Sequence, residues 1–180
     1  PNAGKSSFVS WVTSAHPKIA AYPFTTLEPV LGVVDNRGGT FVIAEIPGLV
    51  EGAAQGGGLG HEFLRHAERT RLFLHLLDGS GIDPIEDFKR VNEELELYSP
   101  DLATRPQIVV INKTDISEVR ERLPELVSAL NEVGVEAMDI SAATGEGIQV
   151  VLDRLMQGVE PAQGKRKPSK EKFIDGAPVR

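Results

Sequence analysis

The sequence predicts one α/β domain with a mostly parallel sheet, one antiparallel hairpin pair, and helices on both faces. Its 180 residues are 41% hydrophobic and 25% charged, which is ordinary for a globular chain. Residues 71–78 and 107–112 are nearly continuous apolar runs, which suit strands buried on both faces of a parallel sheet. Amphipathic segments with helical spacing alternate with these runs, as in parallel α/β folds.

The remaining strands are predicted from shorter signals. Residues 29–35 and 40–46 flank the turn-rich tetrapeptide 36–39, and this arrangement predicts a β-hairpin. Residues 135–140 form a further apolar segment, which predicts a strand near the C-terminal end of the domain.

Helices are predicted over residues 84–98, 117–132 and 146–157, because apolar side chains recur there every three or four residues. Ser117 is the expected N-cap of the second helix, and Gly134 lies just beyond its end. These segments place the expected domain at residues 1–157.

Composition limits the possible functions. Twenty-six acidic residues against nineteen basic ones give a net charge of −7, which argues against a uniformly basic nucleic-acid binder. There is no cysteine, so disulfides and thiolate chemistry are excluded. No apolar run reaches the roughly 20 residues that span a bilayer. Residues 158–180 are expected to be a linker or tail, and their basic positions 165–167 and 170 are a candidate RNA contact.

The chain opens with half of a phosphate-binding loop. Gly4-Lys5-Ser6 matches the end of the pattern G-x-x-x-x-G-K-[ST]. Backbone N–H groups of such a loop surround phosphates, the lysine neutralises them, and the hydroxyl binds Mg²⁺. A helix is expected to follow over residues 7–14. The first glycine of the pattern and the strand that feeds the loop are not in the sequence.

A base-recognition motif follows the apolar run 107–112. Asn112, Lys113 and Asp115 match N-K-x-D, in which the carboxylate accepts hydrogen bonds from the N1–H and the exocyclic amine of guanine. Adenine presents the opposite pattern of donors and acceptors. The last predicted strand is followed by a second segment of this kind, the S-A-x sequence Ser141, Ala142 and Ala143.

Two segments carry the expected γ-phosphate sensors. The sequence Glu45, Ile46, Pro47 and Gly48 resembles D-x-x-G, with Glu45 in place of the aspartate that reaches Mg²⁺ through water. The second segment precedes the hairpin and supplies a threonine for Mg²⁺, for which Thr26 is chosen over Thr25. Its expected nucleotide-contacting residues are Phe24, Thr25, Thr26, Leu27 and Glu28. Together the motifs lie at strand ends, where open α/β sheets bind ligands.

The motif sequence PNAGKSS, the segment YPFTTLEP, the segment IPGLVEGA and the motif NKTD together resemble the Obg-type GTPases of the TRAFAC class. The resemblance covers nearly all of residues 1–157. It implies a P-loop NTPase fold and a Mg²⁺-dependent switch that binds GTP and GDP and hydrolyses GTP slowly. It also implies a monomer of the bacterial cytoplasm that acts in large ribosomal subunit assembly, with rRNA or that subunit as partner, and in growth and stress control.

By this resemblance, the catalytic positions are Lys5, Thr26 and Gly48, and the Mg²⁺ positions are Ser6, Thr26 and Glu45. The remaining nucleotide contacts come from the same motifs, including Asn2, Ala3, Gly4 and Ser7. Leu49 replaces the water-positioning glutamine of Ras-like proteins, which predicts slow hydrolysis. Asn2 matches the asparagine that coordinates K⁺ in related GTPases and predicts stimulation by K⁺.

The sequence leaves two hypotheses open for the function of the chain. In the first, it is a GTP-hydrolysing switch. In the second, it is a truncated, non-catalytic fragment that binds GDP or a partner. We expect the native protein to have residues before Pro1, including the first strand of the sheet, and to have a C-terminal extension after the tail. An ATPase is disfavoured by Asn112 and Asp115.

Overall fold

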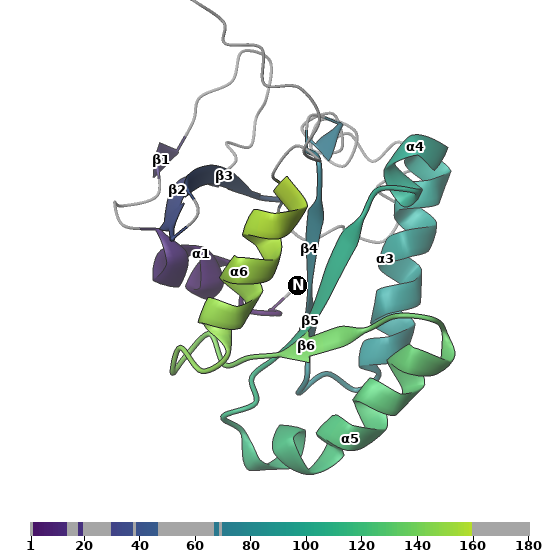
Figure 1. Ribbon diagram of the computed structural model, residues 1–180. Coiled ribbons are helices and arrows are strands. Elements are labelled where there is room, and N and C mark those ends of the chain that lie inside the picture. Colours follow the sequence, from purple (N-terminus) through teal and green to yellow (C-terminus); the bar gives the residue numbers. More distant parts are fainter. Residues whose placement is uncertain are drawn as a thin grey trace, which may run out of the picture.

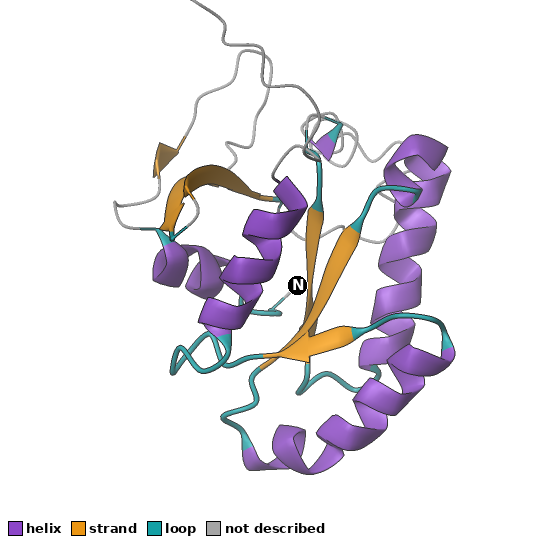
Figure 2. Ribbon diagram, viewed as in Figure 1, coloured by secondary structure: helices purple, strands orange, loops and turns teal. Residues whose placement is uncertain are grey.

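The computed structural model describes residues 2–13, 18–19, 30–37, 39–46, 67–68 and 70–159. Figure 1 shows their arrangement, with one group of strands near the centre between helices and a second group of strands at the upper left. Figure 2 separates the elements by type. None of the described helices is long and apolar enough to cross a membrane.

The first sheet is antiparallel. Strand β1 (Lys18–Ile19) pairs with β2 (Val30–Asn36), and β2 pairs with β3 (Gly39–Glu45). The β2–β3 register runs from Val30 opposite Glu45 to Asn36 opposite Gly39, so the predicted hairpin is confirmed. Gly39 has φ +142°, a conformation that suits glycine at the end of a tight turn. Strand β1 was not expected from the sequence.

The second sheet is parallel, in the order β4 (Phe73–Asp78), β5 (Gln107–Asn112) and β6 (Ala137–Asp139). Its register sets Asp78 opposite Asn112, so these two strands end side by side. The expected strands and the α/β class are confirmed. Among the described residues, however, the strands form two separate three-stranded sheets.

The helices agree closely with their predicted ranges. Helix α1 covers Lys5–Val12, α3 covers Pro84–Tyr98, α5 covers Ser117–Glu132 and α6 covers Ile148–Val159. A short helix, α4 (Pro100–Ala103), follows α3 and was not predicted. Helix α6 includes two residues that the sequence had assigned to the tail.

The expected N-cap of α5 is wrong by one residue. Ile116 is the N-cap, and Ser117 is the first residue of the helix. No side chain caps this end of the helix with a hydrogen bond. The turn after β5 explains this, because the Ile116 N–H donates to the Lys113 carbonyl at 3.0 Å. The Ile116 carbonyl then accepts the first helical hydrogen bond, from the Arg120 N–H at 3.0 Å.

Two apolar clusters cover the faces of the parallel sheet. Helices α1 and α6 pack on one face, with Phe8, Val110 and Val151 at the centre. Helices α3 and α5 pack on the other face around Leu77, Ile111 and Leu130. The first cluster also takes Phe41 and Ile43 from β3 and Leu74 and Leu76 from β4, so the two sheets share one core although no ladder joins them within the described residues.

Candidate functional site

The phosphate loop enters α1 through a left-handed glycine. Gly4 has φ +89° and is the N-cap of α1, and its carbonyl accepts the first helical hydrogen bond, from the Phe8 N–H at 2.9 Å. A Cβ on Gly4 would lie 2.3 Å from the Asn112 side-chain amide nitrogen. Any other residue at position 4 would therefore be both strained and in collision. Asn2 is also left-handed, with φ +58°.

Asn112 joins three of the predicted motifs. Its side-chain amide donates to the Ala3 carbonyl at 2.7 Å, and its side-chain oxygen accepts from the Ala142 N–H at 2.8 Å. The residue is 2% exposed. The phosphate loop, the base motif and the S-A-x segment are thus held together by one buried amide, although they are far apart in sequence.

The base motif is also tied to the S-A-x segment through Asp115. The Ser141 hydroxyl donates to the Asp115 carboxylate at 2.6 Å and accepts from the Thr144 N–H at 3.1 Å. The Thr114 N–H donates to the Ile140 carbonyl at 3.1 Å, which continues the contact between the ends of β5 and β6. These bonds fix the position of the carboxylate that the sequence assigns to guanine.

Lys113 is positioned by the end of β4. Its ammonium group donates to the Asp78 carboxylate at 2.5 Å and to the Ser80 hydroxyl at 3.1 Å. Burial raises the pKa of Asp78, but hydrogen bonds from Lys113 and Ser80 outweigh it and hold this pKa below its ordinary value of 3.8. The carboxylate is therefore ionised at neutral pH, and an ion pair forms at this edge of the site.

The two described residues that were assigned to Mg²⁺ lie together. The Ser6 hydroxyl donates to the Glu45 carboxylate at 2.9 Å, which joins the start of α1 to the end of β3. A hydroxyl and a carboxylate suit a hard cation that takes further ligands from phosphates and water. In the described ranges, no group of three or more His, Asp or Glu could hold an ion. These residues fit Mg²⁺ held partly by a nucleotide.

The other predicted residues divide into two groups. Lys5 is half-buried at the start of α1, and Ser7 and Ala143 are exposed beside the motifs. Ile46 packs against the apolar cluster of Ala67, Leu95 and Leu102. The remaining predicted residues lie outside the described part of the chain. They are Phe24, Thr25, Thr26, Leu27, Glu28, Pro47 and Gly48.

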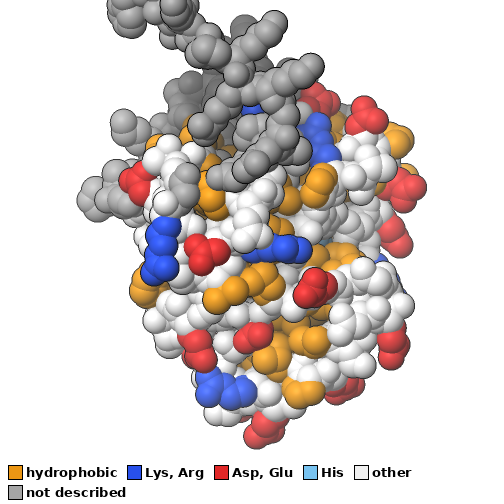
Figure 3. All heavy atoms as spheres, viewed as in Figure 1, with side chains coloured by type: hydrophobic (Ala, Val, Ile, Leu, Met, Phe, Trp, Pro, Cys, Tyr) orange, Lys and Arg blue, Asp and Glu red, His pale blue; other side chains and the backbone are white. Residues whose placement is uncertain are grey.

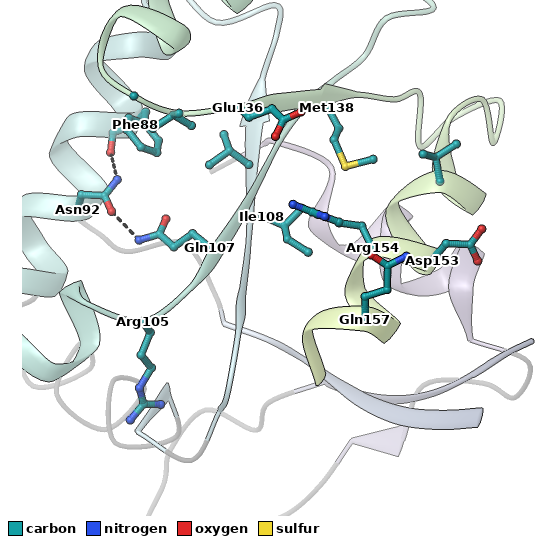
Figure 4. Close-up of a pocket in the computed structure, with 14 residues that line it drawn as sticks. Phe88, Asn92, Arg105, Gln107, Ile108, Glu136, Met138, Asp153, Arg154 and Gln157 are labelled. Carbon is teal, nitrogen blue, oxygen red and sulfur yellow. Dashed lines mark hydrogen bonds between the residues drawn. The ribbon is translucent and has the colours of Figure 1, made fainter. Parts of the chain in front are cut away.

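A hollow of about 690 Å³ lies away from these motifs. Figure 4 shows it between α3, the start of β5 and α6, with Asn92, Gln107 and Arg154 along its walls. None of the described residues of the predicted nucleotide site lines it. On the described part of the face in Figure 3, Lys and Arg are scattered among Asp and Glu, without a continuous basic area.

Sequence reasoning missed Asp78 and Ser80. The signal was present, because Asp78 ends a buried apolar run in the same way that Asn112 ends the next one. It also missed that Asn112 connects loops. Its predicted part in base recognition gave no reason to expect a contact with Ala3.

Comparison of this sequence with known protein families and proteins agrees with this geometry. The family described as "50S ribosome-binding GTPase" matches residues 1–113. GTPase Obg of Alkaliphilus metalliredigens is 58% identical over 157 residues, which cover 85% of this chain and 37% of that protein. GTPase Obg of Dehalococcoides mccartyi is 50% identical over 171 residues, which cover 95% of this chain and 40% of that protein. The chain thus spans about two fifths of the length of these relatives.

Solved structures share the fold. The G domain of the T. maritima FeoB iron transporter has a TM-score of 0.66 at 21% identity, covering 88% of this chain and 92% of that one. The cytosolic domain of the same transporter in a GDP form has a TM-score of 0.70 at 20% identity, covering 89% and 60%. With its motifs joined at the strand ends and more than half of its length matched, the chain belongs to this GTPase family and resembles the Obg GTPases within it.

Proposed function

We propose that this chain binds GTP and GDP and hydrolyses GTP, and so acts as a guanine-nucleotide switch. The observation that carries the proposal is the buried Asn112 side chain, which bonds to both Ala3 and Ala142. A phosphate loop and a base-binding loop are useful together only at one fixed separation. Asn112 sets that separation, as a site for one whole nucleotide requires.

Base selection is assigned to the Asp115 carboxylate, and the aliphatic stem of Lys113 is proposed to lie along the base. Guanine offers two adjacent donors, its N1–H and its exocyclic amine, and a carboxylate accepts both. The hydroxyl of Ser141 orients this carboxylate at 2.6 Å. The backbone N–H group of Ala143 is the donor proposed for the guanine carbonyl, because the Ala142 N–H already donates to the Asn112 side chain.

Phosphate binding is assigned to the start of α1. The Lys5 ammonium neutralises the β- and γ-phosphates, and the backbone N–H groups of residues 2–7 surround them. Ser6 and Glu45, with Thr26, would hold Mg²⁺, and their hydrogen bond supports this part of the proposal. When bound, Mg²⁺ supplies positive charge at the β- and γ-phosphate oxygens. Gly48 is proposed to contact the γ-phosphate through its N–H group.

Hydrolysis is proposed to be slow without help. Leu49 follows the γ-phosphate motif, and an apolar side chain cannot orient the attacking water. The additional charge is assigned to K⁺, with Asn2 as one of its ligands. The left-handed backbone of Asn2 at the entry to the phosphate loop is compatible with this assignment.

For the native protein, we propose a monomer in the bacterial cytoplasm that acts on the large ribosomal subunit. This rests on the family's description as ribosome-binding and on the bacterial Obg relatives. Residues 1–157 are proposed as the GTPase domain, and residues 158–180 as a linker toward a further segment.

We also propose that residues before Pro1 contribute a strand that joins β3 to β4. Both are end strands of their described sheets. Five of the six residues of β4 are only half-buried, although the strand is largely apolar. An intact native polypeptide of 19.4 kDa that starts at Pro1 would contradict this proposal.

The described strands form two sheets that are not joined, and this favours a second candidate function. In it, the chain is a fragment that binds GDP without hydrolysing GTP. Single-turnover release of phosphate from GTP distinguishes the two. If the chain is a GTPase, phosphate release should depend on Mg²⁺ and should be lost in Lys5→Ala. It should be retained in Lys89→Ala, the matched control, because Lys89 is an exposed lysine of α3. GDP binding without phosphate release would favour the fragment, and no binding of either nucleotide would contradict both.

A further inference from the structure

We infer that Asp78 and Ser80 are positioning residues for the base half of the nucleotide site, because they hold the Lys113 ammonium group and so fix its aliphatic stem beside the base. The inference rests on the proposed function and extends it to two residues outside the recognised motifs. It predicts a contribution to nucleotide affinity and none to phosphate transfer.

The three side chains form a closed ring of hydrogen bonds. The Lys113 ammonium donates to Asp78 Oδ2 at 2.5 Å and to the Ser80 hydroxyl at 3.1 Å. The Ser80 hydroxyl in turn donates to Asp78 Oδ1 at 2.6 Å, and the Ser80 N–H donates to the same oxygen at 2.9 Å. Both carboxylate oxygens are engaged, so the ammonium is held from two sides.

The backbone keeps this ring in register with the base motif. Asp78 lies opposite Asn112 in the parallel ladder, and the Gly79 N–H donates to the Asn112 carbonyl at 3.1 Å. A Cβ at position 79 would lie 2.6 Å from that carbonyl and 2.5 Å from Val119. The turn after β4 therefore packs directly on the strand end that leads into Lys113.

Lys113 itself has an unusual backbone conformation. Its φ is +73°, which is uncommon for a residue other than glycine. Such a conformation persists where the surroundings determine it, and it is concentrated at ligand sites. A lysine side chain has a flexible four-carbon stem. Fixing both the backbone and the ammonium group of Lys113 therefore restricts the conformations of the stem between them.

The competing explanation is an ordinary ion pair at a strand end. The side chains of Lys113 and Asp78 are 28% and 17% exposed, so such a pair would contribute to folding and leave nucleotide binding unchanged. The two explanations predict different effects of substituting these residues on the affinity for different ligands. A base-positioning role affects GDP and GTP and has no effect on pyrophosphate, which lacks the base.

The test is a double-mutant cycle with fluorescent GDP. Asp78→Asn should weaken GDP binding about tenfold in the wild-type background and much less in Lys113→Met, whose ammonium is already lost. Ser80→Ala should cause a smaller loss. The matched control is Asp153→Asn, since Asp153 is also a hydrogen-bonded carboxylate but lies on α6, bonded to Asn36 and Gln149.

Competition by pyrophosphate provides the second readout, and thermal unfolding checks that each variant is folded. The inference expects unchanged pyrophosphate affinity and an unchanged rate of hydrolysis at saturating GTP in Asp78→Asn. Equal losses for GDP and pyrophosphate, or losses that add across the cycle, would overturn the inference alone. A wild-type chain that binds no GDP would overturn the proposed function, and this inference with it.

Discussion

Replacing Asn112 with alanine should separate the loops of the site. The substitution removes the donor to the Ala3 carbonyl and the acceptor from the Ala142 N–H, which lie at 2.7 and 2.8 Å. Both backbone groups are buried and would lose a partner at once. Nucleotide affinity should fall together with stability, because the phosphate loop and the S-A-x segment would no longer be held at one distance.

The size of the effect follows from those two bonds. Two buried backbone groups left without a partner cost about 2–6 kcal/mol together. For a chain of this length, each kcal/mol lowers the melting temperature by about 2–4 °C, so Tm should fall by roughly 4–24 °C. Asn112→Asp is the sharper variant, because it keeps an acceptor for Ala142 but directs an oxygen at the Ala3 carbonyl.

Thermal unfolding followed by circular dichroism, with and without GDP, measures both effects. Asn131→Ala, an exposed asparagine on α5, is the matched control and should unfold with the wild type. Additional stabilisation by GDP should be large in the wild type and small in both Asn112 variants. An Asn112→Ala protein with wild-type Tm and wild-type stabilisation by GDP would refute the assignment of Asn112 as the link between the loops.

Four further predictions follow from the same geometry. Gly4→Ala should abolish GDP binding, because its φ is +89° and its Cβ would lie 2.3 Å from the Asn112 side chain. Gly134→Ala, which has a similar φ of +79° but open space around the new Cβ, should lower stability through backbone strain and leave GDP binding intact. Asp115→Asn should exchange GDP for xanthosine diphosphate in competition assays, because xanthine has a carbonyl where guanine has its amine; unchanged GDP preference would contradict its role. Burial lowers the pKa of His75 from 6.5 to about 4, so the unfolded chain binds more protons between these values and the free energy of unfolding rises with pH across that window, by at most about 3 kcal/mol. His75→Gln should flatten this part of a denaturation series, and an unchanged slope would show that another group causes it. GTP hydrolysis should be faster in K⁺ than in Na⁺, and Asn2→Ala should remove the difference; equal wild-type rates in both buffers would exclude this role.

Much of the fold could be predicted from periodicity and turn residues. The boundaries of β5, α3 and α5 were predicted to the residue, because their apolar spacing and flanking turns are unambiguous. The N-cap of α5 was placed one residue late, because the choice depends on the turn after Asn112, which joins Lys113 to Ile116. Strand β1 has only two residues and depends on its pairing with β2, so local sequence carries little signal for it.

The residues of the candidate site could be predicted from the sequence, but the contacts that join its motifs could not. The sequence named Gly4, Asn112 and Asp115 from motif spacing, and the structure places the first two in contact and the third against Ser141. The links between motifs run through tertiary contacts such as Asn112 to Ala3, which no local pattern encodes. The pairing of Asp78 with Lys113 was missed for the same reason, since Lys113 follows the next strand in the sequence.

The most direct test of the central claim is a titration of the purified chain with fluorescent GDP in Mg²⁺, followed by displacement with unlabelled GDP and with ADP. If one guanine-nucleotide site is formed by the loops that Asn112 joins, GDP will displace the probe and a large excess of ADP will not. Equal displacement by ADP and GDP, or no binding of the probe to a chain shown to be folded, would contradict the claim.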